Sequence, residues 1–342
     1  MLSCRVVSFV FLLFCVFDVF SHDDVNSLED KSAIWPSNDS QLIFAHVIYR
    51  HGHRNTLDYS DIYPNDPYIN ETHWPGGFGA LTNEAGLFPP HAEEKWHEDI
   101  AWQPIPVHTI PLNLDYVLRG SSNCPRYSAA LKKYESESPE VLRIFEENKE
   151  NILYWSKMCG SNLTTIDDLY CLYDVLLVQS FHNKTLPDWA RKAIEPNGAL
   201  ESINDFSFKM LTITKELARL RSGFLIKEMF QRFAKKINST LEPNCSLWFY
   251  SGHDGTVASL LDSLGVFEAH LPPFASSVHL ELYKVGEEEH YIQIFYRKSE
   301  EEILLPLNIP NCGEKCSLNQ LYNLYNDIIP DHDHDTECRL TN

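Results

Sequence analysis

Residues 42–54 read LIFAHVIYRHGHR, a nearly continuous apolar run that ends in a histidine between two arginines. The apolar part is short and rich in Ile, Val and Phe, which predicts a buried β-strand. The guanidinium groups of Arg50 and Arg54 can bind phosphate oxygens, and an imidazole such as that of His51 can act as a nucleophile. The stretch therefore predicts a strand with a phosphate-binding histidine site at its carboxyl end.

A second stretch repeats this arrangement late in the chain. Residues 247–250 read LWFY and predict another apolar strand, and the polar turn SGHDGT at 251–256 leads into a helix-like run. In α/β folds, reactive groups lie where a strand passes through a turn into a helix. His253 and Asp254 are a weak signal alone, but together with residues 50–54 they form a candidate site.

The rest of the chain changes character in its middle. Residues 55–81 are rich in Pro and Gly and predict a loop, whereas 117–244 has mainly helical periodicity. Residues 277–283 and 291–296 alternate as antiparallel strands do. We therefore expect an α/β core formed by residues 41–116 and 245–342, with the mainly helical region 117–244 inserted between its two parts.

The N-terminus has the features of a secretory signal peptide over residues 1–21, with a basic start, an apolar centre and small residues before a cleavage site. No later stretch is long and apolar enough to predict a transmembrane anchor. Asn-x-Ser/Thr acceptor sequences favour a glycosylated protein of the secretory pathway. Six of them occur, at Asn38, Asn70, Asn162, Asn183, Asn238 and Asn244.

The chain carries a formal net charge of −20. Binding to a nucleic-acid backbone relies on clustered Lys and Arg side chains, so this charge argues against a nucleic-acid partner. Basic residues that do cluster, such as Arg50 and Arg54, can still attract a phosphate locally.

These motifs resemble those of the histidine acid phosphatases of the prostatic and lysosomal type. The resemblance continues in WPGGFGALT at 74–82, HNKTLP at 182–187 and LPPFAS at 271–276, and it covers nearly the whole chain after the signal. It implies an α/β fold of the phosphoglycerate-mutase-like kind, with a doubly wound sheet and an inserted, mainly helical cap.

The resemblance also implies a role for each candidate residue. His51 would take up the phosphoryl group, with Arg50, Arg54 and His253 binding the phosphate oxygens and Asp254 protonating the leaving alcohol. No metal or other cofactor is required by this scheme. The expected substrates are phosphate monoesters of small molecules or proteins, and a homodimer is possible by resemblance.

One expected segment is missing after Glu84. In the family, tens of residues that include a helix, a buried strand and a further phosphate-binding arginine separate the stretches that match Glu84 and Ala85, which are adjacent here. We therefore expect an incomplete sheet and a weaker phosphate site, since no substitute arginine is evident nearby in the sequence. A skipped exon or an erroneous gene model would each explain the junction.

Seven cysteines remain after the signal. By resemblance Cys124 would pair with Cys338 and Cys312 with Cys316, whereas Val178 and Ser277 hold the places of a third family bridge. Among the other three cysteines we expect one pair and one free thiol. These three are Cys159, Cys171 and Cys245.

Residues 331–335 read DHDHD and contain side chains that can ligate metals. Metal sites need ligands held in place by surrounding contacts, which a short acidic tail rarely provides, so a solvated terminus is the preferred interpretation.

Two functions remain open at this point. The first is an acid phosphatase, secreted or in the lysosomal lumen, that works through a phosphohistidine on His51. The alternative is a non-catalytic or weakly active secreted glycoprotein of the same family, which lacks the further phosphate-binding arginine.

Overall fold

The structure is a computed structural model that describes residues 40–80, 108–111, 113–299 and 304–340. The predicted signal peptide at 1–21, the acceptor Asn38 and the junction between Glu84 and Ala85 lie outside the described residues. Among the described residues, no helix combines the length and apolar character needed to cross a membrane.

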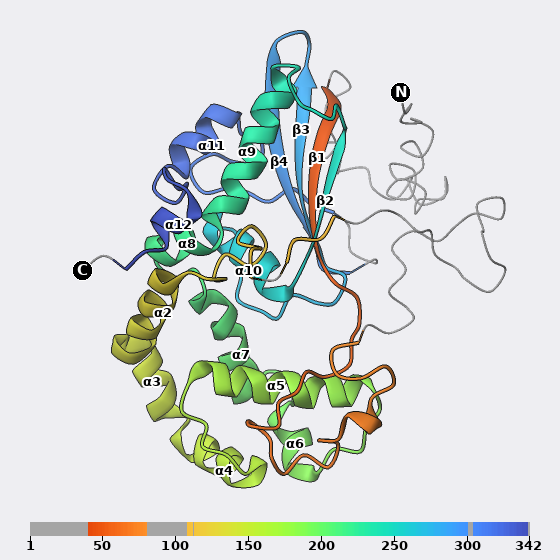
Figure 1. The fold of residues 1–342 in the computed structure, drawn as a ribbon, viewed down its shortest axis with the longest axis vertical. Helices are drawn as coiled ribbons and strands as arrows, with labels where there is room; N and C mark the ends of the chain where they lie inside the picture. Colours follow the sequence, from red (N-terminus) through yellow and green to blue (C-terminus); the bar gives the residue numbers. More distant parts are fainter. Residues whose placement is uncertain (1–39, 81–107, 112, 300–303, 341–342) are drawn as a thin grey trace, which may run out of the picture. The chain divides into compact units, whose positions relative to one another are not determined.

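The described residues form a four-stranded mixed sheet with the order β2-β1-β3-β4 (Figure 1). Strand β1 (Ser40–Arg50) runs parallel to β2 (Leu247–Gly252), and β3 (Ser277–Val285) is antiparallel to β4 (Glu289–Arg297). The core residues of β1 are buried, as its continuous apolar sequence predicts. The structure confirms the predicted α/β class.

Between the two parallel strands, the described chain is mainly helical from Pro125 to Ile237. A parallel pair needs a crossover connection, and here that connection contains the whole helical region. Among the described residues, the helices before β2 are the 3-10 helix η3 (Glu71–His73), α2 (Pro125–Glu137), α3 (Pro139–Glu147), α4 (Lys149–Cys159), α5 (Ile166–Phe181), α6 (Asp188–Ala193), α7 (Ala199–Met210), α8 (Lys215–Arg221) and α9 (Gly223–Ile237). Those after β2 are α10 (Asp254–Ser263), α11 (Leu318–Leu324) and α12 (His334–Glu337).

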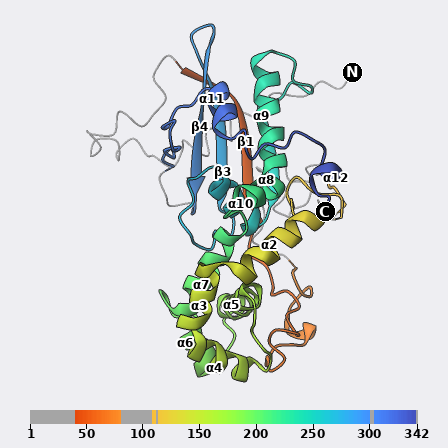
Figure 2. The ribbon, with the colours of Figure 1, turned by 90° about the vertical axis from the view of Figure 1, so that its left-hand side faces the viewer.

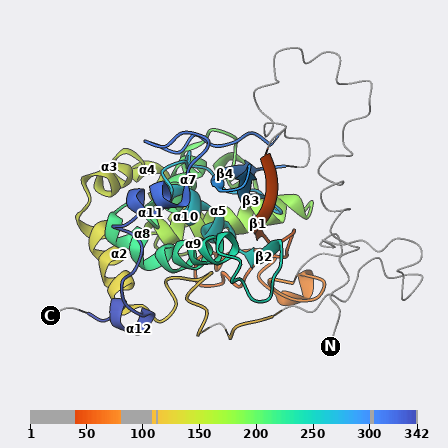
Figure 3. The ribbon, with the colours of Figure 1, turned by 90° about the horizontal axis from the view of Figure 1, so that it is seen from above.

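Two large groups of buried apolar side chains organise these elements. The sheet cluster joins side chains of β1, β3 and β4 to those of α9 and α10, and the helical cluster is formed mainly by α4, α5, α6 and α7. Figures 2 and 3 show α9 along one face of the sheet, where the Met229 carbonyl contacts His46 Nε2 at 3.2 Å. The helical region 117–244 is therefore divided between the two clusters, and its boundaries remain a prediction.

The two edges of the sheet are covered differently. Strand β4 forms backbone bridges with Cys316 and Pro306 from the C-terminal segment. On the other edge, β2 pairs with β1 alone among the described residues, and its Phe249 side chain is 36% exposed.

Cysteine pairing differs from the expectation for three residues. The structure contains the Cys124–Cys338 and Cys312–Cys316 disulfides, but Cys159, Cys171 and Cys245 are all free thiols. The expectation of one further pair is wrong. Packing explains part of this result, since Cys159 belongs to the helical cluster and Cys245 packs against the sheet cluster.

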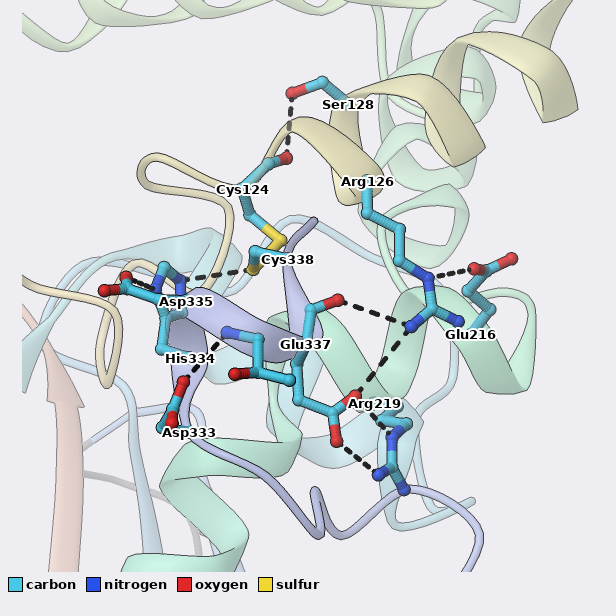
Figure 4. The surroundings of a disulfide bond; sticks show 11 residues. Cys124, Arg126, Ser128, Glu216, Arg219, Asp333, His334, Asp335, Glu337 and Cys338 are labelled. Atoms are coloured by element: carbon cyan, nitrogen blue, oxygen red, sulfur yellow. Dashed lines mark hydrogen bonds and ion pairs between the residues drawn. A yellow bond between two sulfur atoms is a disulfide. The ribbon is translucent and has the colours of Figure 1, made fainter. Parts of the chain in front are cut away.

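The acidic C-terminal tail is ordered around the Cys124–Cys338 disulfide (Figure 4). His334 is only 9% exposed, stacks on Tyr116 with ring centroids 4.7 Å apart, and lies 3.3 Å from the Cys338 sulfur through Nε2. The interpretation of residues 331–335 as a solvated terminus is therefore wrong for His334. Its two neighbouring sulfurs bond to each other and are not free to ligate a metal.

Candidate active site

The carboxyl ends of β1 and β2 bring the two sequence motifs together. Arg50 is opposite Gly252 in the parallel register, and the His51 N–H donates to the Gly252 carbonyl at 3.2 Å. The next residue of each strand then follows in the same direction, so the His51 and His253 rings lie 5.4 Å apart. The parallel pairing of β1 and β2 thus brings together the two motifs from which the site was predicted.

The ring of His51 is oriented by its own loop. Its Nδ1 lies 2.8 Å from the Gly52 carbonyl oxygen, an acceptor, so the proton is on Nδ1 and Nε2 carries the free lone pair. Burial lowers the pKa of His51; the Gly52 contact opposes this shift, while the charges of Arg50 and Arg54 add to it. The neutral, nucleophilic form of the imidazole is favoured.

Arg50 is the most buried charged group of the site, with 1% of its surface exposed. Its guanidinium donates to the Pro272 carbonyl at 2.5 Å and to Asp254 Oδ2 at 2.9 Å, and it lies 3.9 Å from the Phe274 ring centroid. Its Nε–H has no hydrogen-bond partner among the described residues. A buried, unsatisfied donor beside His51 is suited to an incoming anion.

Arg54 is held by the helical region. Its Nη2 donates to both carboxylate oxygens of Asp174 in α5, at 2.9 and 3.1 Å, and the Tyr59 hydroxyl donates to the same carboxylate at 3.0 Å. Burial acts to lower the pKa of Arg54, and the Asp174 carboxylate outweighs this effect and raises it. Arg54 is therefore a fixed positive charge whose position depends on α5.

His253 and Asp254 lie at the amino end of α10. The His253 N–H donates to Thr256 Oγ1 at 3.2 Å, and Asp254 Oδ1 accepts from the Gly255 N–H at 2.7 Å. Burial lowers the pKa of His253; Asp254 opposes this shift, while nearby arginines strengthen it. Backbone contacts thus fix both residues beside Arg50 and His51.

An aromatic group borders the site. The Phe274 ring lies 5.9 Å from His51, 5.1 Å from His53 and 6.1 Å from Phe181. His53 also contacts Phe181 and His182, with ring centroids 5.6 and 4.9 Å apart. His46 is fully buried between Phe44 and Phe233, and burial lowers its pKa to about 3, as for a core histidine.

Two features of the site were not predicted from the sequence. Asp174 is the partner of Arg54, and its only sequence signal is a carboxylate in the otherwise apolar stretch Tyr173-Asp174-Val175-Leu176. Phe274 was noted in the sequence only as part of the stretch LPPFAS at 271–276, and its contact with the site was not predicted.

The predicted acceptors Asn70, Asn162, Asn183, Asn238 and Asn244 are all exposed, and glycosylation remains a prediction.

The comparisons with known proteins identify the family. Residues 80–297 match the histidine phosphatase superfamily, branch 2, and the chain belongs to it. This range includes His253 and Asp254 but begins after residues 50–54. The class defined by the fold and the site is therefore that of the histidine phosphatases.

More specific relatives are acid phosphatases. The chain is 30% identical to prostatic acid phosphatase of Rattus norvegicus, covering 90% of this chain and 91% of the relative. It is 28% identical to lysosomal acid phosphatase of Homo sapiens, covering 89% and 82%. The rat alignment runs over 356 positions, more than the 342 residues of this chain, so the chain has gaps relative to that protein.

Solved structures show the same fold. A phytase from Klebsiella sp. ASR1 superposes with a TM-score of 0.61 at 14% identity, covering 90% of this chain and 98% of that one. A phytase from Citrobacter braakii gives a TM-score of 0.59 at 17% identity, with coverages of 88% and 100%. At these identities the similarity concerns the fold alone.

Proposed function

We propose that this protein is an acid phosphatase that hydrolyses phosphate monoesters through a covalent phosphohistidine on His51. The observation that carries the proposal is the His51 ring, whose Nδ1 contacts Gly52 and whose Nε2 is free, between Arg50 and Arg54 and beside His253. A neutral imidazole with one oriented lone pair among positive charges is what phosphoryl transfer needs.

In the first step, Arg50, Arg54 and His253 bind the non-bridging oxygens of the ester. Nε2 of His51 attacks phosphorus while the bond between phosphorus and the ester oxygen breaks, and Asp254 donates its proton to the leaving alcohol. In the second step, water attacks the phosphohistidine and gives its proton to Asp254. The bond to His51 then breaks and releases inorganic phosphate.

Substrate binding would rearrange the ion pair between Arg50 and Asp254. Without substrate, Arg50 Nη2 donates to Asp254 Oδ2 at 2.9 Å, so this donor of the guanidinium is already used. A dianionic phosphate competes for these donors and leaves Asp254 free to carry a proton. Burial lowers the pKa of His51, which keeps the nucleophile neutral.

The acid phosphatase relatives, the predicted signal peptide and the exposed acceptor asparagines support a location outside the cytosol, secreted or in the lysosomal lumen. Small-molecule or protein phosphate monoesters are the proposed substrates. A homodimer remains a proposal by resemblance to the family.

The test is hydrolysis of a chromogenic aryl phosphate at pH 5 by the purified protein and two variants. His51→Ala should lose roughly 10⁴-fold or more in kcat/KM, because the nucleophile is gone. The control, His53→Ala, alters the same motif and should retain most of the activity. Equal rates for the parent and His51→Ala would reject the proposal.

A second function is favoured by the gaps relative to the acid phosphatases and by the absent arginine. The chain would then be a non-catalytic or weakly active family member that binds phosphate. Sequencing of the message across Glu84 and Ala85 separates the cases: a message that contains the missing segment would identify the junction as an artefact. A message without it would require phosphate binding and turnover to be measured on this chain.

A further inference from the structure

We propose that Arg119 is a third phosphate-binding arginine, which replaces the arginine that is absent from this chain. The inference rests on the proposed phosphatase function and adds a residue to its site. Arg119 lies in the loop that precedes α2, far in sequence from both motifs, and this loop passes beside α10 (Figure 1).

Hydrogen bonds tie this loop to the turn that carries His253. The Leu118 N–H donates to Asp115 Oδ1 at 3.0 Å, which closes a local turn. The Leu118 carbonyl then accepts from the Thr256 hydroxyl at 3.0 Å, and the same hydroxyl oxygen accepts from the His253 N–H at 3.2 Å. One shared side chain therefore connects the residue before Arg119 to the backbone of His253.

Close packing fixes the loop on the other side of Arg119. Gly120 is buried, and a side chain at this position would collide with the Arg221 backbone. The Arg221 guanidinium donates to the Ser121 hydroxyl at 3.2 Å, and the Cys124–Cys338 disulfide holds the end of the loop. Arg119 is thus flanked by anchored residues, so its side chain starts from a defined position.

The charge of Arg119 acts on the His253 side of the site. Burial lowers the pKa of His253 and Asp254 opposes this; among the arginines, Arg119 lowers that pKa more strongly than Arg54 or Arg50. The pKa of His51, in contrast, is lowered by Arg50 and Arg54. The charge of Arg119 therefore acts on His253, in agreement with the hydrogen bonds through Thr256 that join its loop to the His253 backbone.

Arg119 is also available to bind an anion. Arg50 is paired with Asp254 and Arg54 with Asp174, whereas the half-buried Arg119 side chain has no hydrogen-bond or ion-pair partner within the described part of the chain. A guanidinium beside a phosphate-sized site, without a competing carboxylate, can make paired hydrogen bonds to phosphate oxygens.

The experiment compares Arg119→Ala and Arg119→Lys with the parent, using an aryl phosphate as substrate and inorganic phosphate as inhibitor. Arg119→Ala should lower kcat/KM about 10²-fold and weaken inhibition by phosphate about 10-fold. Arg119→Lys restores the charge but not the planar pair of donors, and it should recover part of both losses. The matched control is Arg143→Ala, which removes an exposed arginine of α3 and should change neither quantity.

A structural role for Arg119 would show as a lower melting temperature without weaker phosphate inhibition, and that result would overturn the proposal. Normal turnover and normal inhibition in Arg119→Ala would overturn it too, while the phosphatase function would stand. If the folded parent binds phosphate in calorimetry without turnover, the phosphatase proposal fails, and the affinity of Arg119→Ala for phosphate still decides the role of Arg119. A parent that neither binds phosphate nor turns over would reject both.

Discussion

The sheet cluster and the helical cluster support the same site in different ways. The sheet side supplies the groups that would react, because Arg50 ends β1 and His51 and His253 directly follow β1 and β2. The helical side supplies Asp174, which carries no proposed chemistry but holds Arg54 by two hydrogen bonds. Backbone pairing can position a nucleophile by itself, whereas a long, flexible arginine side chain needs a partner from another layer to keep its place.

The strongest test of this difference is Asp174→Asn. The carboxylate and the Arg54 guanidinium are both buried, with 4% and 7% of their side-chain surface exposed, so losing one leaves an unpaired buried charge. We expect the free energy of unfolding in urea to fall by about 3 to 5 kcal/mol. The control Glu147→Gln breaks the exposed pair with Arg143 and should cost under about 1 kcal/mol. Equal stability of Asp174→Asn and the parent would mean that the helical side does not hold Arg54.

The second test removes the covalent link between the start of α2 and the C-terminal segment. The double variant Cys124→Ala, Cys338→Ala should lower the free energy of unfolding by about 2 to 5 kcal/mol, since the bridge joins residues 214 positions apart. Cys312→Ala, Cys316→Ala opens a bridge between residues only 4 apart and should cost less. Denaturant titrations of both double variants check the order, and the reverse order would contradict the expectation.

The third test concerns acidification of the sheet side. His46 has a pKa of about 3 in the folded protein and near 6.5 when unfolded, so between these pH values the unfolded chain binds more protons. Its contribution to stability is therefore complete above pH 6.5 and is lost as the pH falls. From pH 7.5 to pH 5 this amounts to about 2 kcal/mol.

Between pH 7.5 and pH 5, the variant His46→Leu should lose about 2 kcal/mol less unfolding free energy than the parent. Unfolding in urea at pH 7.5 and pH 5 measures it, and His332→Leu, at an exposed position, is the control. The difference between the two pH values is the quantity to compare, because the substitution also removes the contact with the Met229 carbonyl. Parallel pH dependences of parent and variant would contradict the assignment.

The smallest effect is expected at the amino end of α5, the helix that carries Asp174. The Thr165 hydroxyl accepts from the Asp168 N–H at 3.0 Å, and the Asp168 carboxylate accepts from the Thr165 N–H at 2.9 Å. Thr165→Ala should cost about 1 kcal/mol of unfolding free energy, measured by thermal unfolding. Thr109→Ala, at an exposed position before α2, is the control. If the two variants melt alike, the capping box contributes nothing measurable.

The parts of the fold that could be predicted from sequence are those set by local patterns. The apolar runs at 42–49 and 247–250 became parallel strands, and the alternating runs near the C-terminus became the β3–β4 hairpin. Both candidate motifs could be found for the same reason, since each follows its strand directly. Helical periodicity in 117–244 predicted helices, but it could not tell that α9 packs on the sheet and α5 does not.

The remaining features depend on contacts between distant residues. Arg54 and Asp174 are separated by 120 positions, and nothing in either neighbourhood specifies the other. His334 is in an acidic, polar stretch, and its burial follows from stacking on Tyr116, far away in the chain. Tertiary packing of this kind overrides local composition, which is why the tail was predicted wrongly.

The parallel pairing of β1 with β2 also has a consequence for the making of the protein. Ala45 pairs with Leu247, so residues 51–246 must leave the ribosome after β1 before its partner strand exists. At ordinary translation speeds this takes roughly 10 to 40 s, during which β1 has an unpaired edge. A newly made chain therefore carries its most apolar strand without this neighbour for most of its synthesis, and it depends on protection from aggregation in that interval.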